Sequence, residues 1–165
     1  IGEVPSLVGW LESVETDGLA FMQGRLKVGE AKAPPLIRAL KKHAPERGWT
    51  ILDAPPGTSC PVIAAVRGAD FVLLVTEPTP FGLNDLKLAV GLVRALALPF
   101  GVVVNRAGYG DRAVYDWCEE EAIPILLEIP FSKKIASAYA DSGTLLDADP
   151  SWDNAMQTLA MRCAP

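Results

Sequence analysis

The sequence predicts a three-layer α-β-α fold with a mostly parallel β-sheet. Half of the 165 residues are hydrophobic, which is enough for one globular domain with a sizeable core. From residue 49 onward, short apolar runs alternate with amphipathic helical patterns, an order typical of parallel strands joined by right-handed crossovers. The runs are almost continuously apolar, as expected of strands buried on both faces.

The expected elements follow in a regular order. We expect strands at residues 50–53, 71–76, 101–105 and 123–128. Helices are expected at residues 61–67, 82–97, 111–121 and 132–139, with a final helix at 152–162. The clearest amphipathic pattern lies in 82–97, where Leu83, Leu86, Val90, Val93 and Leu96 share one side.

The first 30 residues have a different pattern. They alternate between polar and apolar residues, and we expect short irregular or antiparallel strands broken by Gly18, Gly24 and Gly29. Pro34-Pro35 then opens a helix, because proline is favoured in a first helical turn. We find no linker, and therefore expect a single domain over residues 1–165, with β-α repeats in 31–165.

Composition excludes several classes of function. The net charge is −5 and the basic residues are scattered along the chain, so we expect no nucleic-acid partner. The longest apolar run, residues 71–76, is far below the roughly 20 residues that span a bilayer. Three widely spaced cysteines without a C-x-x-C pair predict reduced thiols in the cytoplasm rather than a zinc or cluster site. We interpret Cys60 as a small buried residue opening a helix, in preference to a reactive thiol.

The most informative segment is residues 49–61, Trp-Thr-Ile-Leu-Asp-Ala-Pro-Pro-Gly-Thr-Ser-Cys-Pro. A short apolar strand delivers Asp53 and then stops at two prolines, which cannot donate ladder hydrogen bonds. Gly57 follows, and glycine accepts backbone angles closed to other residues. Ligands bind at the carboxyl edge of such a sheet, where a carboxylate suits Mg²⁺ and a glycine N–H suits a phosphate oxygen. The alternative is an ordinary turn in which Asp53 caps the next helix.

A second candidate site follows the apolar run Val102-Val103-Val104. Asn105 carries both donors and an acceptor, which match the donor and acceptor of an adenine edge. Arg106 is suited to stack on a base or to reach a phosphate. The alternative is that Asn105 only begins a turn into Ala107-Gly108.

Two further loops follow strands. Residues 128–131, Glu-Ile-Pro-Phe, lead into a helix with Ser132 as its expected N-cap, and their backbone could line a base pocket. Residues 76–83 contain two prolines and form a rigid candidate partner surface, in which Glu77 is a weak candidate base.

These segments resemble the MinD/ParA-type P-loop ATPases, and the run Asp-Ala-Pro-Pro-Gly-Thr resembles their switch segment. The long run 76–86 narrows the resemblance to the branch with an inserted ferredoxin domain, over about residues 15–146. The resemblance implies that Asp53 holds Mg²⁺ and that Gly57 senses the γ-phosphate. It implies that Asn105 reads adenine beside Arg106, and that Pro130 and Phe131 line the adenine pocket.

The phosphate-binding loop of that superfamily is missing from the sequence. There is no Gly-x-x-x-x-Gly-Lys-Ser/Thr run and no ferredoxin cysteine pattern. We therefore expect the C-terminal part of an ATPase that lacks the P-loop strand and is inactive alone. The resemblance implies ATP and Mg²⁺ in the intact protein, iron–sulfur clusters in the absent insert, a homodimer around nucleotide, and an iron–sulfur or electron-transfer client.

The sequence leaves two other functions open. One is a non-catalytic module of the same fold that binds a protein through residues 76–83. The other is the nucleotide-binding part of an enzyme similar to the cobyrinic acid a,c-diamide synthases.

A missing P-loop strand leaves a gap between the strands at 50–53 and 71–76. Unpaired buried backbone groups are costly, so we expect the gap to be filled. The two strands could pair directly, residues 1–30 could insert, or another copy could supply a strand; the first and third are preferred. We also expect Asp53, Gly57 and Asn105 to lie on one rim of the sheet.

Overall fold

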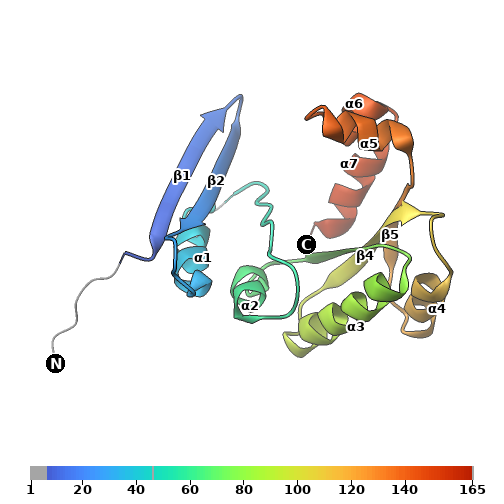
Figure 1. Cartoon of the computed structure of the whole chain (residues 1–165), viewed down its shortest axis with the longest axis horizontal. Coiled ribbons are helices and arrows are strands. Elements are labelled where there is room, and N and C mark those ends of the chain that lie inside the picture. Colours follow the sequence, from blue (N-terminus) through green and yellow to red (C-terminus); the bar gives the residue numbers. More distant parts are fainter. Residues whose placement is uncertain (1–6, 46, 165) are drawn as a thin grey trace. The chain divides into compact units, whose positions relative to one another are not determined.

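The structure is a computed structural model that describes residues 7–45 and 47–164. The chain divides into two compact units, Ile1–Arg67 and Gly68–Pro165. Figure 1 shows the elements of each unit. The expectation that residues 1–165 form a single domain stays a prediction.

The first unit begins with an antiparallel hairpin of β1 (Gly9–Thr16) and β2 (Leu19–Leu26). Asp17 and Gly18 form its two-residue loop, and both have positive φ angles, 45° and 79°. Such a pair is favoured there because its twist matches that of the strands. The prediction of antiparallel strands is confirmed, but Gly24 lies inside β2 and does not break it.

Gly24 instead allows a helix to pack closely on the hairpin. Helix α1 (Ala33–Lys41) begins with two prolines, as predicted. A Cβ atom at position 24 would lie 2.8 Å from Leu40 Cδ1 and 3.0 Å from Leu36 Cγ. The absence of a side chain therefore brings α1 against β2.

The end of α1 is tied to α2 (Cys60–Val66) through one ammonium group. Lys41 Nζ donates hydrogen bonds to the carbonyl oxygens of Ala65 (2.7 Å) and Arg67 (2.6 Å) at the end of α2. Carbonyls at a helix end lack intrahelical partners, and a cation is favourable there. Lys41 is therefore a structural contact between the two helices.

The predicted strand at 50–53 is wrong, because this segment pairs with no strand of the described residues. A strand is stable only within a ladder, and no strand of the described residues supplies one to this segment. Its apolar side chains are left exposed, Ile51 at 90% and Trp49 at 61%. How the expected gap is filled, by direct pairing, by residues 1–30 or by a strand from another copy, stays a prediction.

The second unit contains a parallel sheet in the order β3-β4-β5. Its strands are β3 (Val72–Thr76), β4 (Phe100–Ala107) and β5 (Ile125–Pro130). The helices between them are α3 (Pro80–Ala95) and α4 (Ala113–Glu120). After the sheet come α5 (Lys133–Ala140), α6 (Leu145–Ala148) and α7 (Trp152–Cys163).

Helices lie on both sides of this sheet (Figure 1), and the predicted α/β fold with parallel pairing is confirmed. The core lies between the sheet and α3 and α4. Its buried residues are Leu86, Val90, Val102, Val104, Val114, Cys118 and Ile123. Ser132 stands at the predicted N-cap of α5, whereas α6, which begins with a Thr144–Asp147 capping box, was not predicted.

Strand β3 is buried on one face only. Val72 and Thr76 are buried, but Leu73 and Val75 on the opposite face are 38% and 63% exposed. Among the described residues β3 is also an edge strand, because only β4 pairs with it. The described residues of the second unit therefore leave one apolar face of β3 uncovered.

The cysteines differ in burial, which leads to a prediction. Cys60 is exposed, contrary to expectation, although it opens α2 as expected, while Cys118 is buried in the core. Burial raises the pKa of the Cys118 thiol above the ordinary value of 9.0. We expect Ellman's reagent to modify Cys60 rapidly in the folded protein and Cys118 only on unfolding.

The same shift predicts a pH dependence. Because the folded pKa is raised, the neutral thiol contributes stability in full below the unfolded pKa, and this contribution is lost as pH rises through the folded pKa. The Cys118→Ala variant should therefore lose less stability than the parent protein between pH 8 and pH 10 in urea titrations. An identical pH profile for both proteins would contradict this assignment.

Candidate functional site

Three loops meet at the carboxyl end of the sheet in the second unit. Glu77 follows β3, the pair Asn105-Arg106 lies in the last residues of β4, and Pro130 ends β5 with Phe131 directly after it. Parallel strands place these loops at one edge, where open α/β sheets bind ligands. The structure thus brings together the four candidate residues of this unit: Asn105, Arg106, Pro130 and Phe131.

An irregularity near the end of β4 determines how these side chains point. The pairing with β5 shifts register between Asn105 and Ala107, and Arg106 has a positive φ angle of 55°. A non-glycine residue in this region costs about 1–3 kcal/mol, so surrounding contacts must hold it there. Bulges of this kind re-aim side chains next to binding sites.

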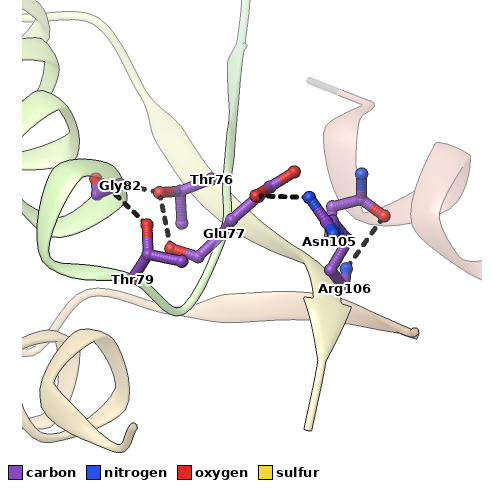
Figure 2. A network of polar contacts seen from close by, with 6 residues as sticks. All are labelled: Thr76, Glu77, Thr79, Gly82, Asn105 and Arg106. Atoms are coloured by element: carbon purple, nitrogen blue, oxygen red, sulfur yellow. Dashed lines mark hydrogen bonds and ion pairs between the residues drawn. The ribbon is translucent and has the colours of Figure 1, made fainter. Parts of the chain in front are cut away.

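Arg106 lies at the centre of a cluster of contacts. Its Nη1 is 3.3 Å from Glu77 Oε2, as Figure 2 shows. Its guanidinium carbon is 4.7 Å from the ring centroid of Tyr109 and 5.3 Å from that of Phe131. The two rings are themselves 5.1 Å apart. The guanidinium therefore faces two aromatic rings, which favours cation–π attraction.

Backbone contacts join the same loops. The Phe131 N–H donates to the Ala107 carbonyl at 3.0 Å, which connects the loop after β5 to the end of β4. A Cβ at Gly110 would overlap the carbonyl oxygen of buried Pro78, so the loop after β4 lies directly on the loop after β3. Only a residue without a side chain permits this approach.

Two side-chain hydrogen bonds make the loop after β3 rigid. Thr79 accepts a hydrogen bond from the Gly82 N–H at 3.0 Å and caps α3, and the Thr76 hydroxyl donates to the Gly82 carbonyl at 2.9 Å (Figure 2). An N-cap threonine of this kind satisfies a free helix donor. Glu77 is thereby held between two anchored residues.

Asn105 has a free hydrogen-bonding edge. Its Oδ1 accepts from the Arg106 backbone N–H at 3.0 Å, while its Nδ2 donates to no residue of the described chain. The side chain borders an open hollow of about 350 Å³, which Thr76, Glu77 and Phe81 also line. A free donor beside an acceptor with a spare lone pair suits a heterocyclic base.

The strand β5 contributes its own polar contact. Glu128 accepts a hydrogen bond from the Tyr115 hydroxyl at 3.1 Å. Burial raises the pKa of Tyr115, and the bond to Glu128 adds to the shift. This hydrogen bond connects α4, which carries Tyr115, to β5.

Asp53 and Gly57 belong to the first unit. Both are exposed, and Gly57 has a φ angle of 91°, which confirms that this position uses an angle glycine favours. Whether Asp53, Gly57 and Asn105 share one rim stays a prediction.

The carboxylate of Asp53 fits Mg²⁺ as one ligand only. The described residues include no group of three or more potential metal-ligating side chains. Mg²⁺ in nucleotide sites takes one or two carboxylates and completes its shell with water and substrate phosphates. A single exposed carboxylate, such as that of Asp53, is therefore enough as the protein ligand in a site of this kind.

A second hollow lies in the first unit and gathers basic residues that appeared scattered in the sequence. It measures about 540 Å³ and is lined by Arg38, Lys41, Lys42 and Arg67 together with Cys60. All four cations stand in the last turn or at the C-cap of α1 or α2. Compensation of the helix dipole accounts for their positions.

Sequence reasoning missed Tyr109 and undervalued Glu77. Tyr109 lies only three residues after Arg106, in a loop flanked by Gly108 and Gly110, and that spacing could have indicated it. Glu77 lies 29 residues from Arg106, so its role as a partner depends on the parallel pairing of β3 with β4.

No model of a known protein family matches the chain. The chain is 31% identical over 142 residues to an uncharacterized protein of Methanocaldococcus jannaschii, covering 84% of this chain and 49% of that protein. It is 27% identical over 123 residues to a protein of Dictyostelium discoideum named cytosolic Fe-S cluster assembly factor NUBP2 homolog, covering 63% and 46%. The chain therefore spans about half the length of the curated relatives it matches.

Two solved structures have a similar fold. The cell division ATPase MinD of Pyrococcus furiosus aligns with a TM-score of 0.66 and 24% identity, over 89% of this chain and 65% of that chain. The MinD cell division protein of Aquifex aeolicus aligns with a TM-score of 0.66 and 19% identity, over 91% and 67%. In the described part of this chain, no helix is both long and apolar enough to cross a membrane.

Proposed function

We propose that this chain, which is related to the MinD/ParA-type P-loop ATPase superfamily, is the base-recognition and switch part of an ATP-binding and ATP-hydrolysing protein. The observation that carries the proposal is the free edge of Asn105, beside Arg106 and Phe131 at the carboxyl end of a parallel sheet. In this proposal Asn105 recognises adenine, and Pro130 and Phe131 line the base pocket.

The remainder of the nucleotide site is proposed to lie partly in the first unit. Asp53 would be a ligand of Mg²⁺, and Gly57 would donate its backbone N–H to the terminal phosphate. Bound Mg²⁺ would neutralise charge on the phosphates. The sequence contains no phosphate-binding loop, so hydrolysis is proposed for the complete gene product and not for this chain alone.

The biological setting is proposed from one relative. The Dictyostelium protein is named a cytosolic Fe-S cluster assembly factor. We infer that ATP hydrolysis here is coupled to iron–sulfur or electron-transfer chemistry, in a cytoplasmic homodimer that closes around nucleotide.

A second candidate function has one supporting observation. Phe81, at the start of α3, is 85% exposed and follows a loop held rigid by Thr76 and Thr79. A large apolar side chain on a rigid surface suits contact with a protein partner. The segment 76–83 would then bind a client protein, either in addition to nucleotide binding or instead of it.

The first test concerns base preference. We expect Asn105→Ala in the complete gene product to weaken ATP binding by about 1–3 kcal/mol, because an adenine edge loses its partner. The Asn105→Asp variant should shift preference toward GTP, because a carboxylate only accepts hydrogen bonds and guanine presents N–H donors. Isothermal titration calorimetry with ATP and GTP measures both effects.

The control is Asn154→Ala, which removes an exposed asparagine from α7. It should leave both affinities unchanged. If Asn105→Ala weakened ATP and GTP binding equally, Asn105 would not be the residue that reads the base. The partner-binding function would then be favoured if Phe81→Ser abolished co-purification of a client while nucleotide affinity stayed unchanged.

A further inference from the structure

We propose that Glu77 is a positioning residue for base selectivity, acting on Asn105 through Arg106. The inference rests on the proposed function, since it concerns the same base site. Glu77 comes from the loop after β3, whereas Asn105 and Arg106 come from β4, so the ion pair joins two neighbouring strand ends (Figure 2).

The first step is the restraint on Arg106. Its guanidinium is paired with Glu77 at 3.3 Å and lies against the rings of Tyr109 and Phe131. A planar cation fixed at its edge by a carboxylate and at its face by aromatic rings has few remaining orientations. In this arrangement Arg106 is a structural cross-link and not a free ligand for phosphate.

The second step connects Arg106 to the amide of Asn105. The Arg106 backbone N–H donates to Asn105 Oδ1 at 3.0 Å, so the backbone position of Arg106 sets the plane of that amide. Arg106 has a φ of 55°, a conformation that costs free energy and that its side-chain contacts help to stabilise in this proposal. Loss of the Glu77 carboxylate should therefore rotate the amide away from the orientation that matches one base.

Glu77 also affects the charge at the rim of the site. The side chains of Arg106 and Glu77 are 40% and 39% exposed, and the carboxylate neutralises a cation at the rim of the site. Without that carboxylate, Arg106 becomes an unpaired cation able to attract the phosphates of any nucleotide. The rotated amide of Asn105 and the unpaired cation of Arg106 would both make nucleotide binding depend less on the identity of the base.

The experiment compares affinities for ATP and GTP in the complete gene product. We expect Glu77→Gln to lower the ratio of ATP affinity to GTP affinity about three- to fivefold, a size typical of a half-exposed ion pair. The Glu77→Asp variant keeps the charge and should recover part of the ratio. A purely structural role would lower the thermal midpoint without changing this ratio.

A matched control is available in the same unit. Glu121 pairs with Arg94 at 2.6 Å, with side chains 41% and 47% exposed, and Glu121 stands at the C-cap of α4, the opposite end of that helix from the β4 loop. Glu121→Gln should lower stability by a similar amount and leave the affinity ratio unchanged. If Glu77→Gln left the ratio of ATP affinity to GTP affinity unchanged, as is expected of Glu121→Gln, Glu77 would not be a positioning residue.

The two proposals fail in different ways. A parent protein that shows no preference for ATP over GTP, or an Asn105→Ala variant that retains the full preference, overturns the proposed function. Loss of preference in Asn105→Ala with full preference in Glu77→Gln overturns only the role of Glu77.

Discussion

Replacing Asp53 by alanine is expected to abolish ATP hydrolysis by the complete gene product, with a loss of about a hundredfold or more. Asp53 provides an exposed carboxylate, which is proposed to act as a ligand of Mg²⁺. Asp53→Asn should have a similar effect, since it keeps the shape of the side chain and removes the charge. Steady-state release of phosphate at several Mg²⁺ concentrations measures the loss.

Asp70→Ala is the control for the loss of one negative charge. Asp70 is another exposed aspartate and lies shortly before β3. Its hydrolysis rate should equal that of the parent protein. Binding of ATP in the absence of Mg²⁺ should be unchanged in Asp53→Ala, since the carboxylate is proposed to act on the metal. A hydrolysis rate within twofold of the parent rate in Asp53→Ala would exclude this aspartate as the proposed ligand.

Gly110→Ala is expected to destabilise the second unit by about 1–3 kcal/mol. The new Cβ would overlap the carbonyl oxygen of Pro78, a backbone atom of a fully buried residue that cannot move aside cheaply. The loop after β4 must shift instead, and with it the residues that surround Arg106. Urea unfolding followed by circular dichroism measures the change in the free energy of unfolding.

The matched control for this variant is Gly91→Ala. Gly91 lies in α3 with open space where a Cβ would be, and alanine is the better helix former. This variant should raise the free energy of unfolding by about 0.4–1 kcal/mol. Equal effects of the two substitutions would mean that Gly110 and Pro78 are not in close contact.

Much of the second unit can be predicted from the sequence because its determinants are local. The apolar run before Asn105 predicts β4, and the spacing of Leu83, Leu86, Val90 and Val93 predicts α3. The polar residues at strand ends then follow from parallel pairing, since it places the carboxyl ends at one edge. Parallel pairing thus predicts Asn105 and Arg106 at this edge, whereas the family resemblance assigned Pro130 and Phe131 to the same candidate site.

The tertiary structure decided what depends on distant partners. The segment 50–53 has the composition of a strand, but a strand requires a neighbour, and the described residues provide none. The sequence alone does not reveal the partners of Arg106. Its contacts with Glu77 and Tyr109 depend on the β3–β4 register and on a bulge in which φ is positive. Local patterns thus determine which segments become helices or strands, whereas pairing and side-chain partners are set by contacts between residues far apart in the chain.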